Sequence, residues 1–171
     1  MTTESPENTV NPETAVDGVT DETAAPRSRA QRRRDTEHRL ATDVDVWVAT
    51  ASQEGVPYLV PLSFAWDGTA LLVATPAGSP TGRNLAASGT VRLALGPTRD
   101  VTMIEGRVEY LEMADLPADE RAAFAARTGF DPAASTTRYR WYRITPLRIQ
   151  AWREADELSG RELMRDGAWL A

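Results

Sequence analysis

Cysteine is absent from the 171-residue chain, which excludes disulfides, zinc–thiolate sites, iron–sulfur clusters and a cysteine nucleophile. Lysine is absent as well, since all 19 cationic side chains are arginine. This excludes Schiff-base chemistry on lysine. Because the guanidinium is a planar fork suited to phosphate and carboxylate rather than to proton transfer, an anion site must be built from arginines or backbone N–H groups.

Histidine is almost absent too, because His38 is the only one. It lies in an Arg-rich segment with no partner that the sequence identifies, so we expect it to be incidental. The sequence contains no Ser-His-Asp arrangement, no cluster with metal-ligand spacing, no Walker loop and no GxGxxG fingerprint. We therefore expect a bound organic cofactor to carry any reaction.

Long apolar runs are missing. No stretch approaches the roughly 20 apolar residues that span a bilayer, and the N-terminus MTTESPENTV has neither the basic nor the apolar region of a signal peptide. We expect a soluble, cytoplasmic protein that does not bind membranes. The length is enough for one compact domain with its own core, but not for two.

The negative charge is concentrated at one end. Residues 1–26 carry six of the 25 acidic residues and no basic one, which predicts a disordered acidic tail. The domain, residues 27–171, then balances 19 arginines with 19 acidic residues. We interpret residues 27–40 as a charged helix that contacts the rest through Ala30, Arg34 and His38, or through Leu40. A solvated helix is favoured over a nucleic-acid-binding one.

Short β-like segments separated by turn residues follow this helix, and they predict a mainly β fold with a few short helices. Six to seven such strands joined by tight turns indicate an antiparallel barrel or sandwich, and we expect the barrel. Two helices, at 81–88 and 117–127, each end at a glycine. The expected strands are residues 44–51, 56–66, 70–75, 91–95, 101–111, 138–144 and 147–153.

One loop has the composition of a phosphate site. Residues 75–85, TPAGSPTGRNL, lead from a strand through small residues into a helix. Backbone N–H groups at the helix start, the hydroxyls of Ser79 and Thr81 and the guanidinium of Arg83 could cradle a phosphate. The alternative is that Ser79 or Thr81 only caps the helix while Arg83 is exposed.

The order of motifs around this loop resembles the FMN-binding split-barrel family of pyridoxamine 5'-phosphate oxidase, including its deazaflavin-dependent branch. A Gly-Val-Pro turn at 55–57 precedes the strand Val60-Pro61-Leu62-Ser63-Phe64, an Asp67-Gly68 turn and the helix start at 79–85. The ending ITPLRIQAW, residues 144–152, is similar to the closing strand of the family. The resemblance covers about residues 27–154.

The resemblance implies a dimeric split barrel that binds FMN, or the deazaflavin coenzyme F420, between two subunits. One subunit would place a strand along the ring and hold the ribityl phosphate, while Trp141, Arg143 and Trp152 are candidates for covering the ring from the other. Thr81-Gly82 stands where many relatives carry lysine. The strand residues implied are Val60, Pro61, Leu62 and Ser63, and the phosphate residues are Thr75, Ser79, Thr81, Arg83 and Asn84.

The function implied is that of a flavin-dependent oxidoreductase that transfers a hydride to or from a small organic substrate. FMN is the family default. The glutamyl tail of a deazaflavin would favour arginines, and these could come from Arg83, Arg92, Arg138, Arg140 and Arg143, although alternate residues of a strand face opposite sides. The alternative is a non-catalytic flavin-binding or regulatory module, or a domain that only dimerises.

Overall fold

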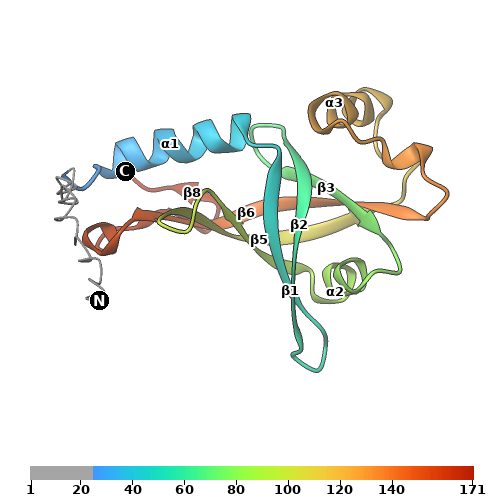
Figure 1. Cartoon of the computed structure of the whole chain (residues 1–171), viewed down its shortest axis with the longest axis horizontal. Coiled ribbons are helices and arrows are strands. Elements are labelled where there is room, and N and C mark those ends of the chain that lie inside the picture. Colours follow the sequence, from blue (N-terminus) through green and yellow to red (C-terminus); the bar gives the residue numbers. More distant parts are fainter. Residues whose placement is uncertain (1–24) are drawn as a thin grey trace, which may run out of the picture.

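The structure is a computed structural model that describes residues 25–171, and the predicted acidic tail lies almost entirely outside the described residues. Eight strands and three α-helices make up the domain (Figure 1). The helices are α1 (Arg29–Thr42), α2 (Pro80–Ser88) and α3 (Ala118–Thr128). The strands are β1 (Asp45–Ala51), β2 (Pro57–Trp66), β3 (Leu71–Pro76), β4 (Thr90–Leu95), β5 (Asp100–Leu111), β6 (Tyr139–Arg153), β7 (Glu162–Arg165) and β8 (Ala168–Trp169).

Six strands close into an antiparallel barrel. They follow the order β3-β2-β1-β4-β5-β6, and β3 also pairs with β6, which joins the two edges. The remaining strands β7 and β8 extend the sheet beyond β6. The predicted mainly β fold and antiparallel barrel are therefore confirmed.

Buried and exposed residues alternate along the strands, and the buried ones form the core of the barrel. In β1, Val46 and Val48 are buried while Trp47 between them faces outwards, as expected for a strand with one buried face. Phe64 and Tyr142 are fully buried in the same cluster. One apolar core inside the barrel thus holds the domain together without covalent cross-links.

The two closing strands expected at 138–144 and 147–153 are one continuous strand, so that prediction is wrong. Strand β6 runs through Pro146, and its pairing with β5 only shifts register there. Arg148 lies opposite Glu105 and Pro146 opposite Gly106, which leaves Leu147 as one extra residue. Such a bulge tolerates a proline because the ladder is already interrupted there.

The β7–β8 hairpin was not predicted. Its turn is Asp166-Gly167, and both residues have positive φ, 50° and 77°. This is the conformation that favours Asp-Gly in two-residue hairpins. The hairpin packs beside α1, where the Arg33 guanidinium lies 4.7 Å from the centre of the Trp169 ring.

Helix α1 lies along one end of the barrel (Figure 1). It begins after Ser28, whose hydroxyl accepts from the Gln31 N–H, a typical N-cap. Its buried residues are Arg32, Thr36 and Leu40. Of the two contact stripes considered, the one through Leu40 is present, and the one through Ala30, Arg34 and His38 is wrong because all three are exposed.

Helices α2 and α3 occupy the part of the molecule opposite α1 (Figure 1). Each ends at a glycine in the left-handed conformation, Gly89 and Gly129, as the sequence predicted. Helix α3 buries Phe124 in a second, smaller core with Leu116 and Trp141 on the outside of the barrel. This second core places α3 beside the strands that carry the predicted site.

Candidate functional site

The barrel is split between β2 and β3. These strands pair only where Phe64–Trp66 meet Leu71–Val73, and β3 otherwise pairs with β6. Within the described part of the chain, no strand pairs with the other edge of β2 from Pro57 to Ser63, because β1 occupies only one edge. Backbone donors and acceptors on such an edge are available to a ligand.

A cavity of about 170 Å³ opens where the two strands diverge, and we call it the cleft. One wall is β2 and the other is the end of β3, while aromatic side chains complete the lining. The lining residues are Pro61, Leu62, Ser63, Ala74, Thr75, Pro76, Phe124, Phe130 and Tyr139.

The aromatic side of the cleft is built by α3 and the residues after it. Phe124 packs edge-on against Trp141, with ring centres 4.9 Å apart. Phe130 follows the Gly129 cap, and the Thr128 hydroxyl accepts from the Phe130 N–H at 3.2 Å. This places the Phe130 ring 5.5 Å from that of Tyr139, tilted by 56°.

The loop before α2 is fixed by its own side chains. Ser79 Oγ accepts from the Gly82 N–H at 3.0 Å and lies 3.3 Å from Thr75 Oγ1. Thr81 is buried, and Asn84 Nδ2 donates to Thr50 Oγ1 at 3.1 Å. Of the phosphate residues implied by the resemblance, Thr75 therefore lines the cleft and Ser79 contacts Thr75, while Thr81 and Asn84 face the protein.

Arg83 is the one cationic side chain of this loop and helix. It is exposed, and its guanidinium donates to the Gly78 carbonyl at the start of the same helix. Tyr142 Oη donates to the Gly82 carbonyl from inside the barrel, and burial raises the pKa of this phenol. The phenol therefore stays protonated and holds α2 in place.

The strand residues implied by the resemblance are brought together. Pro61, Leu62 and Ser63 line the cleft next to Thr75, and Val60 precedes them on β2. Ser63 Oγ donates to Asp45 Oδ1 at 2.7 Å, which orients the hydroxyl. This part of the predicted site forms one continuous wall.

The residues expected to cover the ring are dispersed. Trp141 is fully buried under Phe124, so a stacking role does not fit it. Arg143 forms ion pairs with Asp67 and Glu120 outside the cleft. Trp152 lies far along β6, partly exposed, with the Arg161 guanidinium 5.1 Å from its ring centre.

The cationic run at the start of β6 is neutralised. Arg138 and Arg140 both bind Glu112, at 2.9 and 2.7 Å, and the hydrogen bonds from Arg138 and Arg140 lower the pKa of that carboxyl. Arg92 is similarly paired with Glu105 at 2.7 Å. These arginines do not form an open anion groove for a glutamyl tail.

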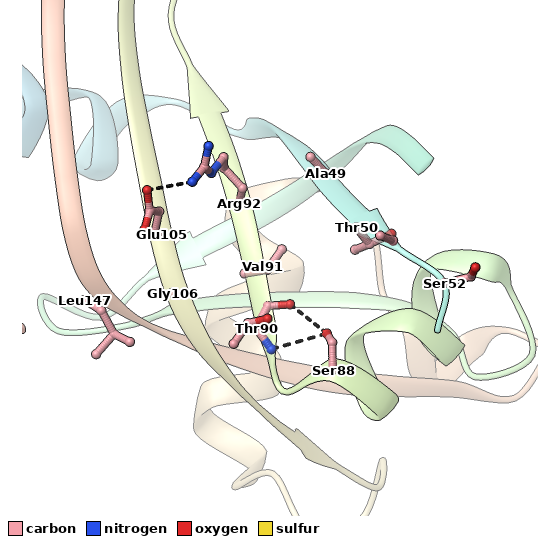
Figure 2. A pocket seen from close by; sticks show the side chains of 11 residues that line it. Ala49, Thr50, Ser52, Ser88, Thr90, Val91, Arg92, Glu105, Gly106 and Leu147 are labelled. Atoms are coloured by element: carbon pink, nitrogen blue, oxygen red, sulfur yellow. Dashed lines mark hydrogen bonds and ion pairs between the residues drawn. The ribbon is translucent and has the colours of Figure 1, made fainter. Parts of the chain in front are cut away.

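A larger depression of about 510 Å³ lies on the outside of the barrel, between β1, β4, β5 and the end of α2 (Figure 2). No sequence motif marks this depression, because the residues that line it come from short, separate segments. Its polar groups bind one another: Ser88 Oγ donates to the Thr90 carbonyl at 2.9 Å, and Arg92 pairs with Glu105. We therefore place no ligand there.

Among residues 25–171 there is no cluster of three or more His, Asp or Glu side chains arranged to hold a metal ion. Within the same residues, no helix has the length and apolar character needed to cross a membrane. His38, the only imidazole of the chain, is exposed on α1 and is not among the cleft-lining residues.

Comparisons with known proteins agree with this architecture. An F420 reductase has the same fold over 66% of this chain and 94% of its own, with TM-score 0.56 and 19% identity. HutZ, a haem storage protein of Vibrio cholerae, covers 71% and 94% (TM-score 0.61, 14% identity). A putative pyridoxamine 5'-phosphate oxidase of Listeria innocua covers 69% and 95% (TM-score 0.55, 14% identity).

Curated proteins give no match to this chain. The family model of pyridoxamine 5'-phosphate oxidase matches residues 38–153, which include all six barrel strands, α2, α3 and every residue that lines the cleft. The chain therefore belongs to the pyridoxamine 5'-phosphate oxidase family.

Proposed function

We propose that the chain binds a flavin-type cofactor, FMN or the deazaflavin F420, in the cleft and uses it for two-electron redox chemistry on a small organic substrate. The observation that carries this proposal is the unpaired edge of β2 at Pro61–Ser63, beside an aromatic wall. An isoalloxazine edge needs backbone donors and acceptors, and its faces need apolar contacts. Membership of the family and the shared fold of an F420 reductase support it.

The residues that line the cleft suit a flavin ring, but the cleft is too small to enclose the whole ring. The volume of the cleft, about 170 Å³, is below the roughly 300 Å³ of the smaller ligand pockets. A tricyclic ring would therefore insert along β2 and keep part of its surface outside. A second subunit that covers this surface would complete the site.

The outer face of the barrel supports a homodimer of this kind. Trp47 and Leu59 are 49% and 59% exposed there, and the strand register places Pro61 and Ala94 beside Trp47. Pro61 lines both the cleft and the depression next to Trp47, so the apolar face is continuous with the cleft. An exposed apolar face of this kind is typical of an interface.

Trp152 remains a proposed ring-covering residue for a geometric reason. It belongs to β6, which is separated from β2 on this side of the barrel by β1, β4 and β5. In a two-fold symmetric interface, a patch on one side of the axis contacts the patch that lies on the other side of the axis in the partner subunit. An axis through the centre of the face would bring Trp152 of one subunit towards the cleft of the other.

The chemistry would come from the cofactor, which accepts or donates a hydride at N5 of a flavin or C5 of a deazaflavin. No charged side chain is among the cleft-lining residues of the described chain. The protein would therefore act by placing the ring and excluding water. The hydroxyl-bearing residues that line the cleft are Ser63, which is held by Asp45, together with Thr75 and Tyr139.

A haem function, which one fold neighbour has by its description, is less well supported by this cleft. Haem proteins commonly use a histidine as axial ligand. The only histidine here, His38, lies on the exposed side of α1. The polar groups of the cleft are instead hydroxyls and backbone, which suit a flavin ring.

The test is a fluorescence titration of the full-length protein with FMN and with F420, using wild type, Ser63→Phe and Ser159→Phe. Phe at 63 would fill the cleft, whereas Ser159 is exposed on a remote loop. We expect micromolar binding of one cofactor, lost in Ser63→Phe and retained in the Ser159→Phe control. Failure of both cofactors to bind wild type would overturn the proposal.

A turnover assay distinguishes a flavin-dependent enzyme from a non-catalytic flavin-binding module. The cofactor-loaded protein is mixed with reductants and candidate acceptors, and the absorbance of the bound ring is followed. An enzyme cycles between oxidised and reduced ring, whereas a non-catalytic flavin-binding module stays oxidised.

A further inference from the structure

We propose that this site recognises its cofactor mainly through the ring, by an aromatic rim formed by Phe130 and Tyr139, and only weakly through the phosphate. The inference rests on the proposed function and specifies its ligand class: a flat tricyclic heteroaromatic ring whose side chain need not be charged. Phe130 is then a specificity-determining residue.

The aromatic rim is held in place at the cleft. The Thr128 hydroxyl donates to the Phe124 carbonyl at 2.9 Å and accepts from the Phe130 N–H. Arg127, one residue earlier, donates to carbonyls at the end of α1 and fixes the position of α3. Phe130 is 39% exposed while Thr128 binds its backbone N–H, so its ring offers a surface that a ligand can cover.

The contacts between rings favour a flat ligand. The Phe130 and Tyr139 rings are 5.5 Å apart, a spacing typical of aromatic pairs. Both line the same cleft as the β2 residues Pro61–Ser63. A planar ring between these walls would gain stacking on one side and backbone hydrogen bonds at its edge.

The phosphate end has few free donors. Pro80 has no N–H, the Gly82 N–H is bound by Ser79 Oγ, and the Arg83 N–H is bound by the Ser79 carbonyl. Only the Thr81 N–H remains unassigned in the first turn of the described helix, and the Thr81 side chain is buried. The start of α2 is therefore a poor anion site, despite its small residues.

Little positive charge is available to bind a phosphate near the start of α2. Arg83 is the only cation between Thr75 and Ser88, and it is exposed. Exposed charge contacts change an affinity by a factor of about five or less. A buried aromatic contact contributes about tenfold. Ring contacts therefore outweigh the phosphate contact at this site.

The experiment measures the Kd of riboflavin and of FMN by flavin fluorescence, with full-length wild type, Phe130→Ala, Phe130→Leu and Arg83→Ala. Tyr110→Ala is the control, because Tyr110 is an exposed aromatic outside the cleft. We expect riboflavin to bind within about fivefold of FMN. Phe130→Ala should weaken both ligands about tenfold, and Phe130→Leu should weaken them less.

Arg83→Ala should weaken FMN less than fivefold and leave riboflavin unchanged, and Tyr110→Ala should change neither. Two results would overturn the inference while supporting the proposed function: FMN binding more than 30-fold tighter than riboflavin, or unchanged binding in Phe130→Ala. If neither riboflavin nor FMN binds wild type, the inference is wrong, and the proposed function is wrong as well if F420 also fails to bind.

Discussion

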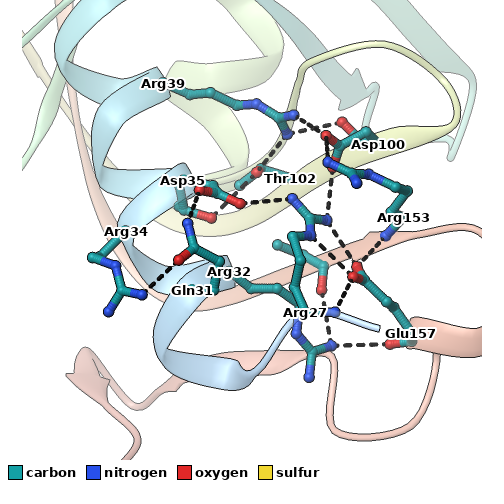
Figure 3. A network of polar contacts seen from close by, with 12 residues as sticks. Arg27, Gln31, Arg32, Arg34, Asp35, Arg39, Asp100, Thr102, Arg153 and Glu157 are labelled. Carbon is teal, nitrogen blue, oxygen red and sulfur yellow. Dashed lines mark hydrogen bonds and ion pairs between the residues drawn. The ribbon is translucent and has the colours of Figure 1, made fainter. Parts of the chain in front are cut away.

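Arg27 binds Glu157 with two sides of one guanidinium: Nε donates to Oε1 at 2.9 Å and Nη2 to Oε2 at 2.8 Å. The same guanidinium also contacts Asp35 and Asp100, and Arg39 donates to Asp100 (Figure 3). The backbone N–H groups of Arg27 and Arg153 complete the coordination of Glu157. This network joins Arg27, two residues before α1, to the first residue of β5 and to the end of β6.

Replacing Glu157 with Gln should destabilise the fold. The Glu157 side chain is only 2% exposed and that of Arg27 11%, so the variant leaves a buried cation with fewer partners. We expect a loss of about 3 kcal/mol in the free energy of unfolding, the lower end for a broken buried pair, because Asp35 and Asp100 remain. Urea unfolding at pH 7 measures it. Glu37→Gln is the control, since its pair with Arg33 is exposed and should contribute less than about 0.5 kcal/mol.

The same carboxylate should make stability depend on pH in the acid range. The hydrogen bonds from Arg27 lower the pKa of Glu157 from 4.5 to about 2. The unfolded chain then binds this proton more readily than the folded one, so the stabilisation is complete above about pH 4.5 and is lost as the pH falls towards 2. Urea unfolding of wild type and Glu157→Gln between pH 7 and 3 should show their difference shrinking below pH 4.5. A constant difference would contradict this assignment.

Much of the barrel was predictable because its strands alternate and its turns carry strong local signals. The prediction failed at Pro146, where the bulge depends on the pairing between Gly106 and β6 and not on local sequence. It also missed β7 and β8, although Asp166-Gly167 is a hairpin signal. Short strands with few apolar residues do not stand out until α1 packs against them.

The candidate site was predictable on one side only. Residues 60–63 and 75–79 form local motifs, and the structure brings Pro61–Ser63 of the first and Thr75 and Pro76 of the second together at the cleft. The aromatic wall was missed because Phe124, Phe130 and Tyr139 reach the cleft through the second core and the pairing of β3 with β6. Trp141 and Trp152 lie on one strand, but Trp141 is fully buried whereas Trp152 is partly exposed. The sequence alone does not distinguish a buried tryptophan from an exposed one.

Gly82 should not tolerate a side chain. A Cβ there would lie 2.4 Å from the Pro76 carbonyl and 3.0 Å from Tyr142 Oη, so Gly82→Ala must displace the loop before α2. We expect a loss of about 2 kcal/mol in unfolding free energy, as for other overpacked sites. Gly78→Ala is the control, because nothing lies within 4 Å of its added Cβ. Equal stability of the two variants would show that the loop is not fixed around Gly82.

Arg127 should anchor α3 over the cleft. Its guanidinium donates to the Ala41 and Asp43 carbonyls at 2.8 and 2.7 Å and lies 5.6 Å from the centre of the Phe64 ring. Arg127→Ala should therefore speed amide hydrogen exchange across α3 and lower stability by about 1 to 2 kcal/mol. Arg121→Ala, in the same helix, has no ion pair among the described residues and serves as the control. Unchanged exchange in Arg127→Ala would show that Phe124 and Leu116 suffice to hold the helix.

Trp47 provides the sharpest test of the proposed homodimer. It is 49% exposed on the barrel face, next to Pro61 at the mouth of the cleft, so a carboxylate at this position would have to be desolvated in a dimer. Trp47→Glu should shift the protein to monomer in analytical ultracentrifugation and weaken cofactor binding in the same samples. Leu158→Glu changes a residue that is 45% exposed but lies outside that face, and it should leave both unchanged. A Trp47→Glu variant that is dimeric would place the interface elsewhere, whereas a monomer that binds cofactor with wild-type affinity would show that one subunit forms the whole site.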